Sequence, residues 1–373
     1  MIQRVLSAFL ISIVSMMSVF SQELSELEKL CDLNPILEES SGLIWLNGEL
    51  WSHNDSGNSN ELFQIDTSDC SVSRIVEISN VINTDWEDIC ADEDYVYIGD
   101  FGNNNGDRTD LCIYRITVDF AGNETIDTVE ADTIYYHYPN QEQFEWDDYS
   151  TNFDCEAMIA NGDSLYLFSK NWGNLKSYLY ALPKTPGDHS ALLLDSLNVE
   201  GLVTGAAIDT IENRLVLLGY NSYMTSSFVF LLDNYTGHHY FDGNVEQFSL
   251  DLMFHQFEGI ALKDDMIMIS NETFQTISAG LHRTFIEVPT GLCGETGRYK
   301  PYFYPNPAKE TIFLKNCKNI HKVTIKTVHG ITMLEKDITQ DSVSLSINHL
   351  TSNTYILEMR GKTHLYTDIL IVE

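Results

Sequence analysis

A repeated pattern of short apolar segments runs through most of this 373-residue chain. Each repeat begins with an acidic or hydroxyl residue ahead of a small or apolar strand, and a second apolar strand then ends in polar turn residues. The five starts are Glu39–Leu43, Trp86–Ile89, Cys155–Met158, Val203–Ala206 and Phe257–Ile260. No long stretch has helical periodicity, so the repeats are predicted to consist of β-strands.

Each repeat has room for four strands. The second strands are predicted at Glu49–Asp55, Tyr95–Gly102, Ser164–Asn171, Arg214–Asn221 and Met266–Glu272. Third and fourth strands follow in most repeats. The fifth repeat lacks a fourth strand, which residues 28–33 near the start of the chain can supply. Repeated four-stranded units are typical of a β-propeller, in which each blade buries its faces against its neighbours.

The spacing of the repeats, about 50 residues, favours five blades. The longest interval, Glu87 to Glu156, has room for a sixth blade, but it also holds a loop predicted at Asn140–Asn152. We therefore predict an all-β chain with a five-bladed propeller over residues 22–290, and a six-bladed propeller is the alternative. A two-sheet sandwich is the remaining alternative, although it does not explain the repeat.

The first residues have the pattern of a secretion signal. An apolar run follows Arg4 and ends at Phe20, and the small residues at 18–21 suit cleavage before Gln22. The run is shorter than the roughly 20 residues that span a bilayer. Residues 1–21 are therefore predicted to be a signal peptide, and an uncleaved anchor is the alternative. No later stretch is apolar enough to cross a membrane, so no transmembrane segment is predicted after signal removal.

A second domain is predicted after residues 291–302, where glycine and proline cluster and the charge balance changes sign. Residues 303–373 contain Tyr304-Pro305-Asn306-Pro307, then alternating strands, a glycine at position 330 and an element from Leu350 to Leu357. In these features the segment resembles the type A C-terminal sorting domain of the type IX secretion system of Bacteroidetes. It departs from that family in having Asn353-Thr354 where glycine is usual, and in its acidic last residue.

The resemblance to the sorting domain implies a small C-terminal β-sandwich. It also implies recognition by the type IX export and sorting machinery, and a protein that is secreted or attached to the outer cell surface. An ordinary carbohydrate-binding or immunoglobulin-like appendage is the alternative.

The predicted propeller carries the negative charge of the chain. The formal net charge is −34, and residues 22–299 hold 11 Lys and Arg against 48 Asp and Glu. Such a surface repels polyanions, so nucleic acid is not a predicted partner. Excess carboxylate suits divalent cations, although a solvated acidic surface accounts for most of these charges.

The chain has seven cysteines, an odd number that leaves at least one outside an intramolecular disulfide. Export makes disulfides feasible, but the sequence does not give their pairing. No Cys-x-x-Cys pair is present, so neither a thiolate zinc site nor a dithiol redox motif is predicted.

The five repeat starts are expected to converge, because the first strand of each blade lines the channel of a propeller. The residues at these positions are Ser41, Glu87, Glu156, Thr204 and Glu258. Carboxylates held close together either take up protons or bind a cation, and ligands that are all oxygen suit Ca²⁺. We predict that this ring binds calcium; hydrogen bonding between blades, with no ion, is the alternative.

Three stretches, Glu39–Asp66, Asp85–Gly102 and Phe257–Ser270, resemble blades one, two and five of the calcium-activated nucleotidases (apyrases). This resemblance implies the propeller fold and a central calcium ion more than it implies a reaction. Ser56 stands where those enzymes have an arginine. The predicted channel is also poor in Lys and Arg, which a polyphosphate substrate would need.

A second set of polar residues is predicted around one mouth of the channel, where the second strands end. It comprises His53, Asn54, Asp55, Asp100, Asn103, Asn104, Lys170, Asn171, Asn271 and Glu272. Among these, His53, Asp55 and Lys170 are the candidates for catalysis, since a histidine beside an aspartate can act as a base. Asn, Asp and Gly also dominate turns for conformational reasons alone, which is the competing interpretation.

Two functions fit these features. The first is a secreted module that binds a glycan, a protein or a small molecule, and it predicts an exposed aromatic patch. The second is a calcium-dependent extracellular hydrolase of a phosphate ester, an anhydride or a lactone, and it predicts an accessible charged group with a shifted pKa. No nucleophile elbow, zinc-binding helix, P-loop or dinucleotide motif is present. The binding module is therefore preferred, and no enzymatic activity is assigned.

Overall fold

The computed structural model describes residues 23–146, 148–250, 252–287, 301–315, 317, 320–328, 330–338, 340, 342–361 and 365–372. The chain forms two compact units, Met1–Pro289 and Thr290–Glu373, which are described separately. The predicted signal peptide lies outside the described residues, as does the predicted linker up to residue 300. Within the described ranges, no helix is long and apolar enough to cross a membrane.

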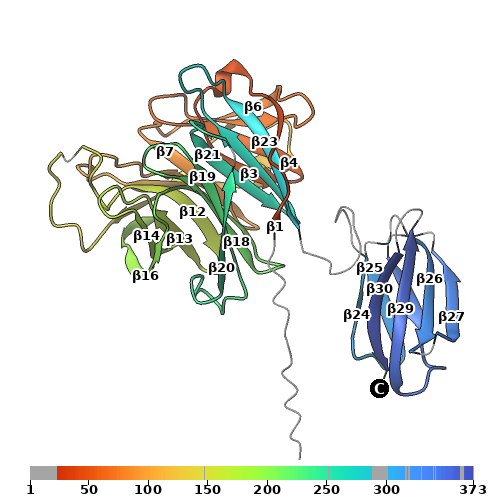
Figure 1. The fold of residues 1–373 in the computed structure, drawn as a ribbon. Coiled ribbons are helices and arrows are strands. Elements are labelled where there is room, and N and C mark those ends of the chain that lie inside the picture. Colours follow the sequence, from red (N-terminus) through yellow and green to blue (C-terminus); the bar gives the residue numbers. More distant parts are fainter. Residues whose placement is uncertain are drawn as a thin grey trace, which may run out of the picture. The chain divides into compact units, whose positions relative to one another are not determined.

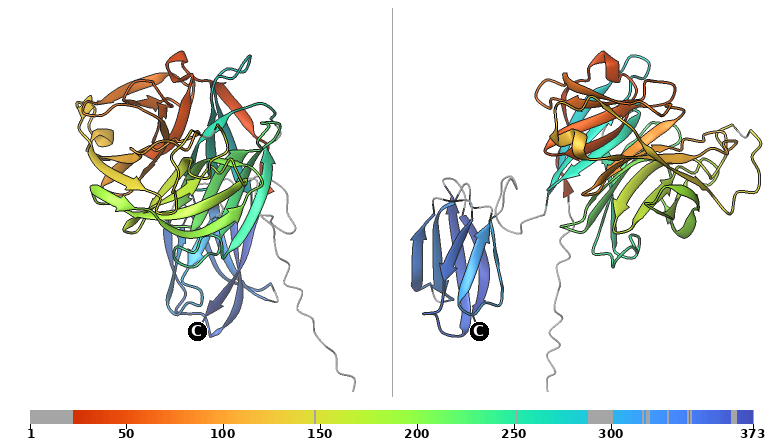
Figure 2. Two further views of the ribbon diagram at one scale, coloured as in Figure 1. Left: turned by 90° about the vertical axis from the view of Figure 1, so that its left-hand side faces the viewer. Right: turned by 180° about the vertical axis from the view of Figure 1, so that it is seen from behind.

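The first unit, over its described residues, is a propeller of five blades (Figure 1). The innermost strands are β3 (Ser40–Leu46), β7 (Trp86–Ala91), β12 (Cys155–Asn161), β17 (Leu202–Asp209) and β21 (Phe257–Lys263). Each of them contacts the next, and β21 contacts β3, so the ring of blades is closed (Figure 2). Residues of all five inner strands line a central channel. The prediction of a five-bladed propeller is confirmed, and the six-bladed and two-sheet alternatives are wrong.

Each inner strand is followed outward by further strands, mostly antiparallel. The second strands are β4 (Glu49–Asn54), β8 (Tyr95–Asp100), β13 (Ser164–Ser169), β18 (Arg214–Tyr220) and β22 (Met266–Asn271). The third strands are β5 (Glu61–Ile65), β9 (Cys112–Thr117), β14 (Lys176–Pro183), β19 (Ser227–Asp233) and β23 (Gly280–Glu287). Outside them lie β6 (Val72–Ile78), β11 (Asp132–His137), β16 (Leu192–Asn198) and β20 (Asn244–Leu250).

Short elements complete the unit. The strand β10 (Thr128–Val129) pairs in parallel with β6, and β15 (Gly187–Ser190) pairs in parallel with β11. A one-turn 3-10 helix spans Pro35–Leu37, and the helix α1 spans Asp119–Gly122. The interval from Glu87 to Glu156 therefore contains one blade and its connections.

The core of the propeller lies between the blades. In β18, Leu215 and Leu217 pack with blade three, whereas Val216 and Leu218 pack with blade five. Successive side chains of a strand point to opposite faces, and both faces of a blade are covered. The central residues of β18 are therefore apolar without alternation, which explains the continuous apolar runs in several repeats.

The N-terminal strands close the ring. The strand β2 (Glu28–Asp32) pairs antiparallel with β23, and β1 (Glu23–Leu24) pairs with the other end of the same strand. The prediction that residues 28–33 complete the fifth blade is confirmed. A disulfide joins Cys31 in β2 to Cys70 in the turn between β5 and β6. The closing strand is thus hydrogen-bonded to blade five and covalently joined to blade one.

The second unit is a small β-sandwich, which confirms the predicted fold. One sheet contains β24 (Tyr302–Tyr304), β25 (Thr311–Lys315) and β28 (Val343–Ser346). The other contains β27 (Thr332–Asp337), β26 (Ile320–Thr327), β29 (Asn353–Gly361) and β30 (Leu365–Val372). Buried side chains from the two sheets, including Ile312, Val323 and Leu357, form one apolar cluster.

Candidate functional site

Each inner strand has a β-bulge near its first residue, at the same end of the channel. The register shifts between Ser40 and Leu43, Trp86 and Asp88, Cys155 and Ala157, Val203 and Gly205, and Phe257 and Gly259. The residues inside these shifts include the five predicted to line the channel: Ser41, Glu87, Glu156, Thr204 and Glu258. A bulge takes a residue out of the alternation of its strand and re-aims its side chain. All five are buried.

The two hydroxyl residues of this ring join neighbouring blades. Ser41 Oγ donates a hydrogen bond to the backbone carbonyl of Glu87 at 2.6 Å, and Thr204 Oγ1 donates to the carbonyl of Phe257 at 2.6 Å. These contacts have the architectural role that was the alternative to a metal site. The two hydroxyl residues of the ring therefore form hydrogen bonds between blades. The surroundings of the three carboxylates, Glu87, Glu156 and Glu258, are different.

Two of the ring carboxylates each keep one oxygen without a hydrogen bond. Glu156 Oε1 accepts from Lys170 Nζ, and Glu258 Oε1 accepts from the hydroxyl of Tyr220 at 3.1 Å. Glu156 Oε2 and Glu258 Oε2 are buried and have no hydrogen-bond partner in the described part of the chain. Buried polar atoms in proteins are nearly always paired, so both oxygens are candidates to bind a cation or a donor group.

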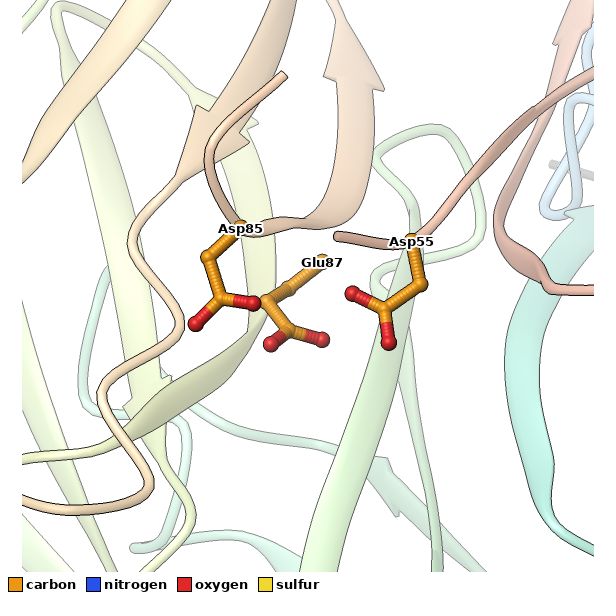
Figure 3. A group of neighbouring side chains, drawn as sticks. All are labelled: Asp55, Asp85 and Glu87. Atoms are coloured by element: carbon orange, nitrogen blue, oxygen red, sulfur yellow. The ribbon is translucent and has the colours of Figure 1, made fainter. Parts of the chain in front are cut away.

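Three further carboxylate oxygens lie together at the same end of the channel. Asp55 follows β4, Asp85 precedes β7 and Glu87 lies in β7, and their carboxylates point toward one another (Figure 3). One oxygen from each lies within 4.8 Å of the other two. We call this group the carboxylate triad. The sequence predicted Glu87 as a metal ligand and Asp55 as a catalytic candidate, and Asp85 was missed. Its position two residues before Glu87 in the same extended segment was the available signal.

The pKa values of the triad are raised. Burial, followed by repulsion from Asp55, raises the pKa of Asp85 to about 7. Burial raises the pKa of Asp55 to about 6, and burial together with the charge of Glu156 raises the pKa of Glu87 well above its usual range. Such a group either holds protons near neutral pH or needs a cation to stabilise its charge.

Lys170 is a buried cation among these carboxylates. Burial by itself lowers the pKa of Lys170, but the charges of Glu156 and Glu258 outweigh it and raise the pKa well above its usual range. Its Nζ lies 5.1 Å from the ring centroid of Trp172 and 5.5 Å from that of Tyr220. Lys170 is therefore held as a counter-ion, a role that the sequence did not distinguish from catalysis.

Asp100 and Arg108 position the segment that carries Asp85. The backbone N–H groups of Thr84 and Asp85 donate to Asp100 at 3.3 and 3.2 Å. Arg108 Nη2 donates to Asp100 at 2.8 Å, and Arg108 Nη1 donates to the carbonyl of Gly102 at 2.8 Å. Asp100, predicted at the channel mouth, thus fixes the backbone that carries Asp85.

His53 is a packing residue. It is fully buried, its ring packs edge-on against Trp86 at 5.7 Å, and burial lowers its pKa to about 4. A Cβ at position 42 would lie 2.6 Å from His53 Nε2, so the imidazole fills the space that Gly42 leaves. We therefore do not propose His53 as a base.

The remaining predicted mouth residues mostly hold turns. The side-chain amides of Asn54, Asn103, Asn171 and Asn271 donate to backbone or side-chain oxygens of nearby loops, and Asn104 accepts from the indole of Trp172 at 3.1 Å. Glu272 is buried, and burial together with the charge of Glu258 raises its pKa well above the usual range. The asparagines thus fit the interpretation as turn residues, whereas Glu272 is a further buried acid close to Glu258.

Residues 302–373 match the family model of the secretion system C-terminal sorting domain. The C-terminal unit is a sorting domain of this kind. A type IX sorting domain marks a protein that is secreted or attached to the outer surface, and it interacts with the type IX machinery. The departures at Asn353-Thr354 lie at the start of β29 and leave its pairing with β30 intact.

Solved structures with similar folds have low identity to this chain. They include aldose sugar dehydrogenase from Streptomyces coelicolor, with 11% identity over 72% of this chain and 99% of that chain and a TM-score of 0.42. They also include PorZ, a surface component of the type IX secretion system of Porphyromonas gingivalis, with 12% identity over 90% and 45% and a TM-score of 0.34. At these identities and TM-scores, the similarity assigns no function to this chain. A comparison with curated protein sequences finds no match. The resemblance to apyrases stays a prediction.

We expect the melting temperature in EGTA to fall by several degrees between pH 6.5 and pH 8. The carboxyls of Asp85 and Glu258 have pKa values of about 7 in the folded protein, raised by burial. A raised pKa means that the folded state binds more protons, so its stability falls as pH rises through that value. Burial lowers the pKa values of His53 and His282. They therefore take up protons only in the unfolded state, and as pH rises above about 6.5 they add a smaller rise in stability, which offsets part of this fall.

Thermal unfolding measured across this pH range tests the expectation. Asp85→Asn removes one titrating carboxyl and should flatten the profile. Asp242→Asn, which changes an exposed aspartate far along the chain from the triad, should leave the profile as it is. A melting temperature that stays constant or rises over this range would contradict the expectation.

Proposed function

We propose that this chain is a secreted binding module whose acidic channel mouth holds a calcium ion and uses it to bind a ligand. The observation that supports this most is the carboxylate triad, Asp55, Asp85 and Glu87, with one oxygen of each within 4.8 Å of the others. A divalent cation would offset their mutual repulsion, and the buried oxygens of Glu156 and Glu258 lie in the same ring of bulges.

The donor set suits calcium. It consists of carboxylate oxygens, with neither sulfur nor imidazole, and Ca²⁺ accepts such hard ligands in irregular geometry. Asp85 keeps 21% of its side chain exposed, so an ion can enter from solvent. We assign Asp55, Asp85 and Glu87 as ligands, with Glu156 and Glu258 as further candidates. Ser41 and Thr204, whose hydroxyls donate to backbone carbonyls, leave the predicted ligand set.

The same geometry favours binding over hydrolysis. Of the three catalytic candidates, His53 is packed between blades, Lys170 is paired with Glu156, and Asp55 belongs to the triad. None of these three is arranged with a serine, cysteine or threonine as an activated nucleophile needs to be. A hydrolase would instead have to use a triad carboxyl as the base that activates a water molecule. The substrate panel in saturating calcium, described below, tests this alternative.

We expect the melting temperature to be roughly 5–10 °C higher in calcium than in EGTA. This assumes a free calcium concentration about 100 times the dissociation constant, at which binding stabilises the folded state by about 2.7 kcal/mol. Asp85→Asn and Glu87→Gln should lose this shift, because each removes a ligand charge. Asp242→Asn is the matched exposed control, and magnesium is the control ion. No shift in the unaltered protein would reject the calcium site.

A substrate panel separates the two functions. Nucleotides, phosphate esters and lactones are tested at a calcium concentration that saturates the thermal shift. The binding module predicts no turnover. Turnover that disappears in Asp85→Asn but persists in Asp242→Asn would overturn the binding module in favour of the calcium-dependent hydrolase.

A further inference from the structure

An aromatic pair lies at the edge of the acidic mouth. Tyr149, in the loop between β11 and β12, is 56% exposed, and its ring centroid lies 4.8 Å from that of Trp172, just after β13. Trp172 is half-buried, and its indole N–H donates to Asp154 at 2.9 Å and to Asn104 at 3.1 Å. Its ring is thus fixed in orientation, although part of it faces solvent.

The backbone holds the two aromatic residues together. The N–H groups of Trp172 and Gly173 donate to the carbonyl of Thr151 at 3.0 and 3.3 Å. A Cβ at Gly173 would lie 2.6 Å from the carbonyl oxygen of Ser150, so only glycine allows this close approach. Tyr149 has φ +49°, a left-handed conformation that is unusual for an aromatic residue. Strained backbone beneath an exposed ring points to a binding role.

A short chain of contacts connects this pair to the carboxylate triad. A Cβ at Gly102 would overlap the carboxylate oxygens of Asp85 and Glu87, so Gly102 lies directly against the triad. The next residue, Asn103, donates its backbone N–H to Asp154 Oδ1 at 2.7 Å, and Asp154 Oδ2 accepts from Trp172. The aromatic pair is therefore connected to the triad by buried contacts through Asn103 and Asp154.

The aromatic pair and the nearby carboxylates together have the chemistry that a sugar ring needs. The C–H face of a pyranose packs on aromatic rings, which offer an apolar body beside polar groups. Its hydroxyls can donate to carboxylates or add oxygen ligands to a calcium ion, which accepts many of them. The charge of the propeller, 11 basic against 48 acidic residues over 22–299, repels acidic polysaccharides at long range.

We propose that Tyr149 and Trp172 form a subsite for a neutral sugar whose hydroxyl groups reach the calcium site at the carboxylate triad. The calcium part of this inference rests on the proposed function. A protein partner is less suited to the aromatic pair, because two rings provide far less area than the roughly 800 Å² that each partner buries in a standard interface.

Affinity electrophoresis tests the sugar subsite. The full chain without its first 21 residues is run in native gels that contain laminarin, mannan, xylan or galactan, and in gels with polygalacturonate as the acidic polysaccharide. We expect retardation by at least one neutral polysaccharide in calcium, weaker retardation in EGTA, and none by polygalacturonate. Trp172→Ala and Tyr149→Ala should weaken the interaction at least tenfold, and Trp172→Phe should keep part of it. Tyr135→Ala, which removes an exposed tyrosine on an outer strand, is the matched control.

The calcium-induced thermal shift is measured for every variant. Trp172→Ala and Tyr149→Ala should keep the shift, which also shows that they are folded. Absence of retardation by all four neutral polysaccharides overturns the subsite, and so does equal retardation of the unaltered protein and both alanine variants. Retardation by polygalacturonate alone overturns the neutral ligand. Retardation without any calcium shift supports the subsite and rejects the calcium site, so the two failures are distinguishable.

Discussion

Replacing Lys170 with methionine is expected to lower the melting temperature in EGTA by roughly 10 °C, from a loss of about 3–5 kcal/mol. The side chain of Lys170 is buried and pairs with the buried carboxylate of Glu156. Methionine keeps most of the volume of lysine but removes the charge. Glu156 and Glu258 are then left without their nearby cation, and a buried charge without a partner is costly.

Two comparisons show whether the loss arises from charge. Lys176→Met changes an exposed lysine at the start of β14 and should have little effect. The double variant Lys170→Met/Glu156→Gln should recover part of the stability, because it removes the unpaired carboxylate as well. A decrease below about 2 °C for Lys170→Met, or no recovery in the double variant, would show that the pair does not carry the stability we assign to it.

The thermal shift caused by calcium should also depend on Lys170. Lys170 supplies one positive charge to the acidic ring, and its loss leaves Glu156 and Glu258 available to a cation. The thermal shift caused by calcium should therefore be larger in Lys170→Met than in the unaltered protein. This result would connect the counter-ion to the proposed ion site.

Replacing Cys31 with serine is expected to lower the free energy of unfolding by roughly 2–4 kcal/mol. The bond between Cys31 and Cys70 spans 39 residues and attaches the closing strand of blade five to blade one. It restricts the conformations of the unfolded chain. It also keeps β2 paired with β23, without which blade five lacks this outer strand. Denaturant unfolding of the oxidised protein and the variant measures the difference.

Reductant provides the control for the disulfide. Dithiothreitol should lower the stability of the unaltered protein to that of Cys31→Ser, and it should have no further effect on that variant. Cys70→Ser should give the same loss as Cys31→Ser, and the double variant should lose no more than either one. Unchanged stability in either single variant would contradict a stabilising role for this bond.

Much of the fold could be predicted from the sequence. In β18, residues Leu215–Leu218 are apolar without alternation because each blade is covered on both faces, and β13 and β22 show the same pattern. Turn residues separate the strands at regular intervals, so the blades could be counted. The closing strand was predictable because the fifth repeat lacked its outer strand.

The candidate site was only partly predictable. Glu87, Glu156 and Glu258 were found because they recur at the same place in each repeat, where the structure has bulges. Asp85 was missed because it precedes its strand, although Asp154 stands at the same place before Glu156. Trp172 and Tyr149 lie in loops and do not recur at the same place in each repeat, and so repetition gave no signal for them.

The sequence by itself determined the strand pattern, the number of blades and the acidic residues of the inner ring, since these depend on local periodicity and on recurring positions. The sorting domain followed from its resemblance to a known family. Only the tertiary structure decided how those acids are used. It paired Glu156 with Lys170, assigned the hydroxyls of Ser41 and Thr204 to neighbouring blades, and brought Asp55 of blade one against Asp85 of blade two. The physical reason is that charge interactions depend on distances across blades, and those distances are fixed only when the ring closes.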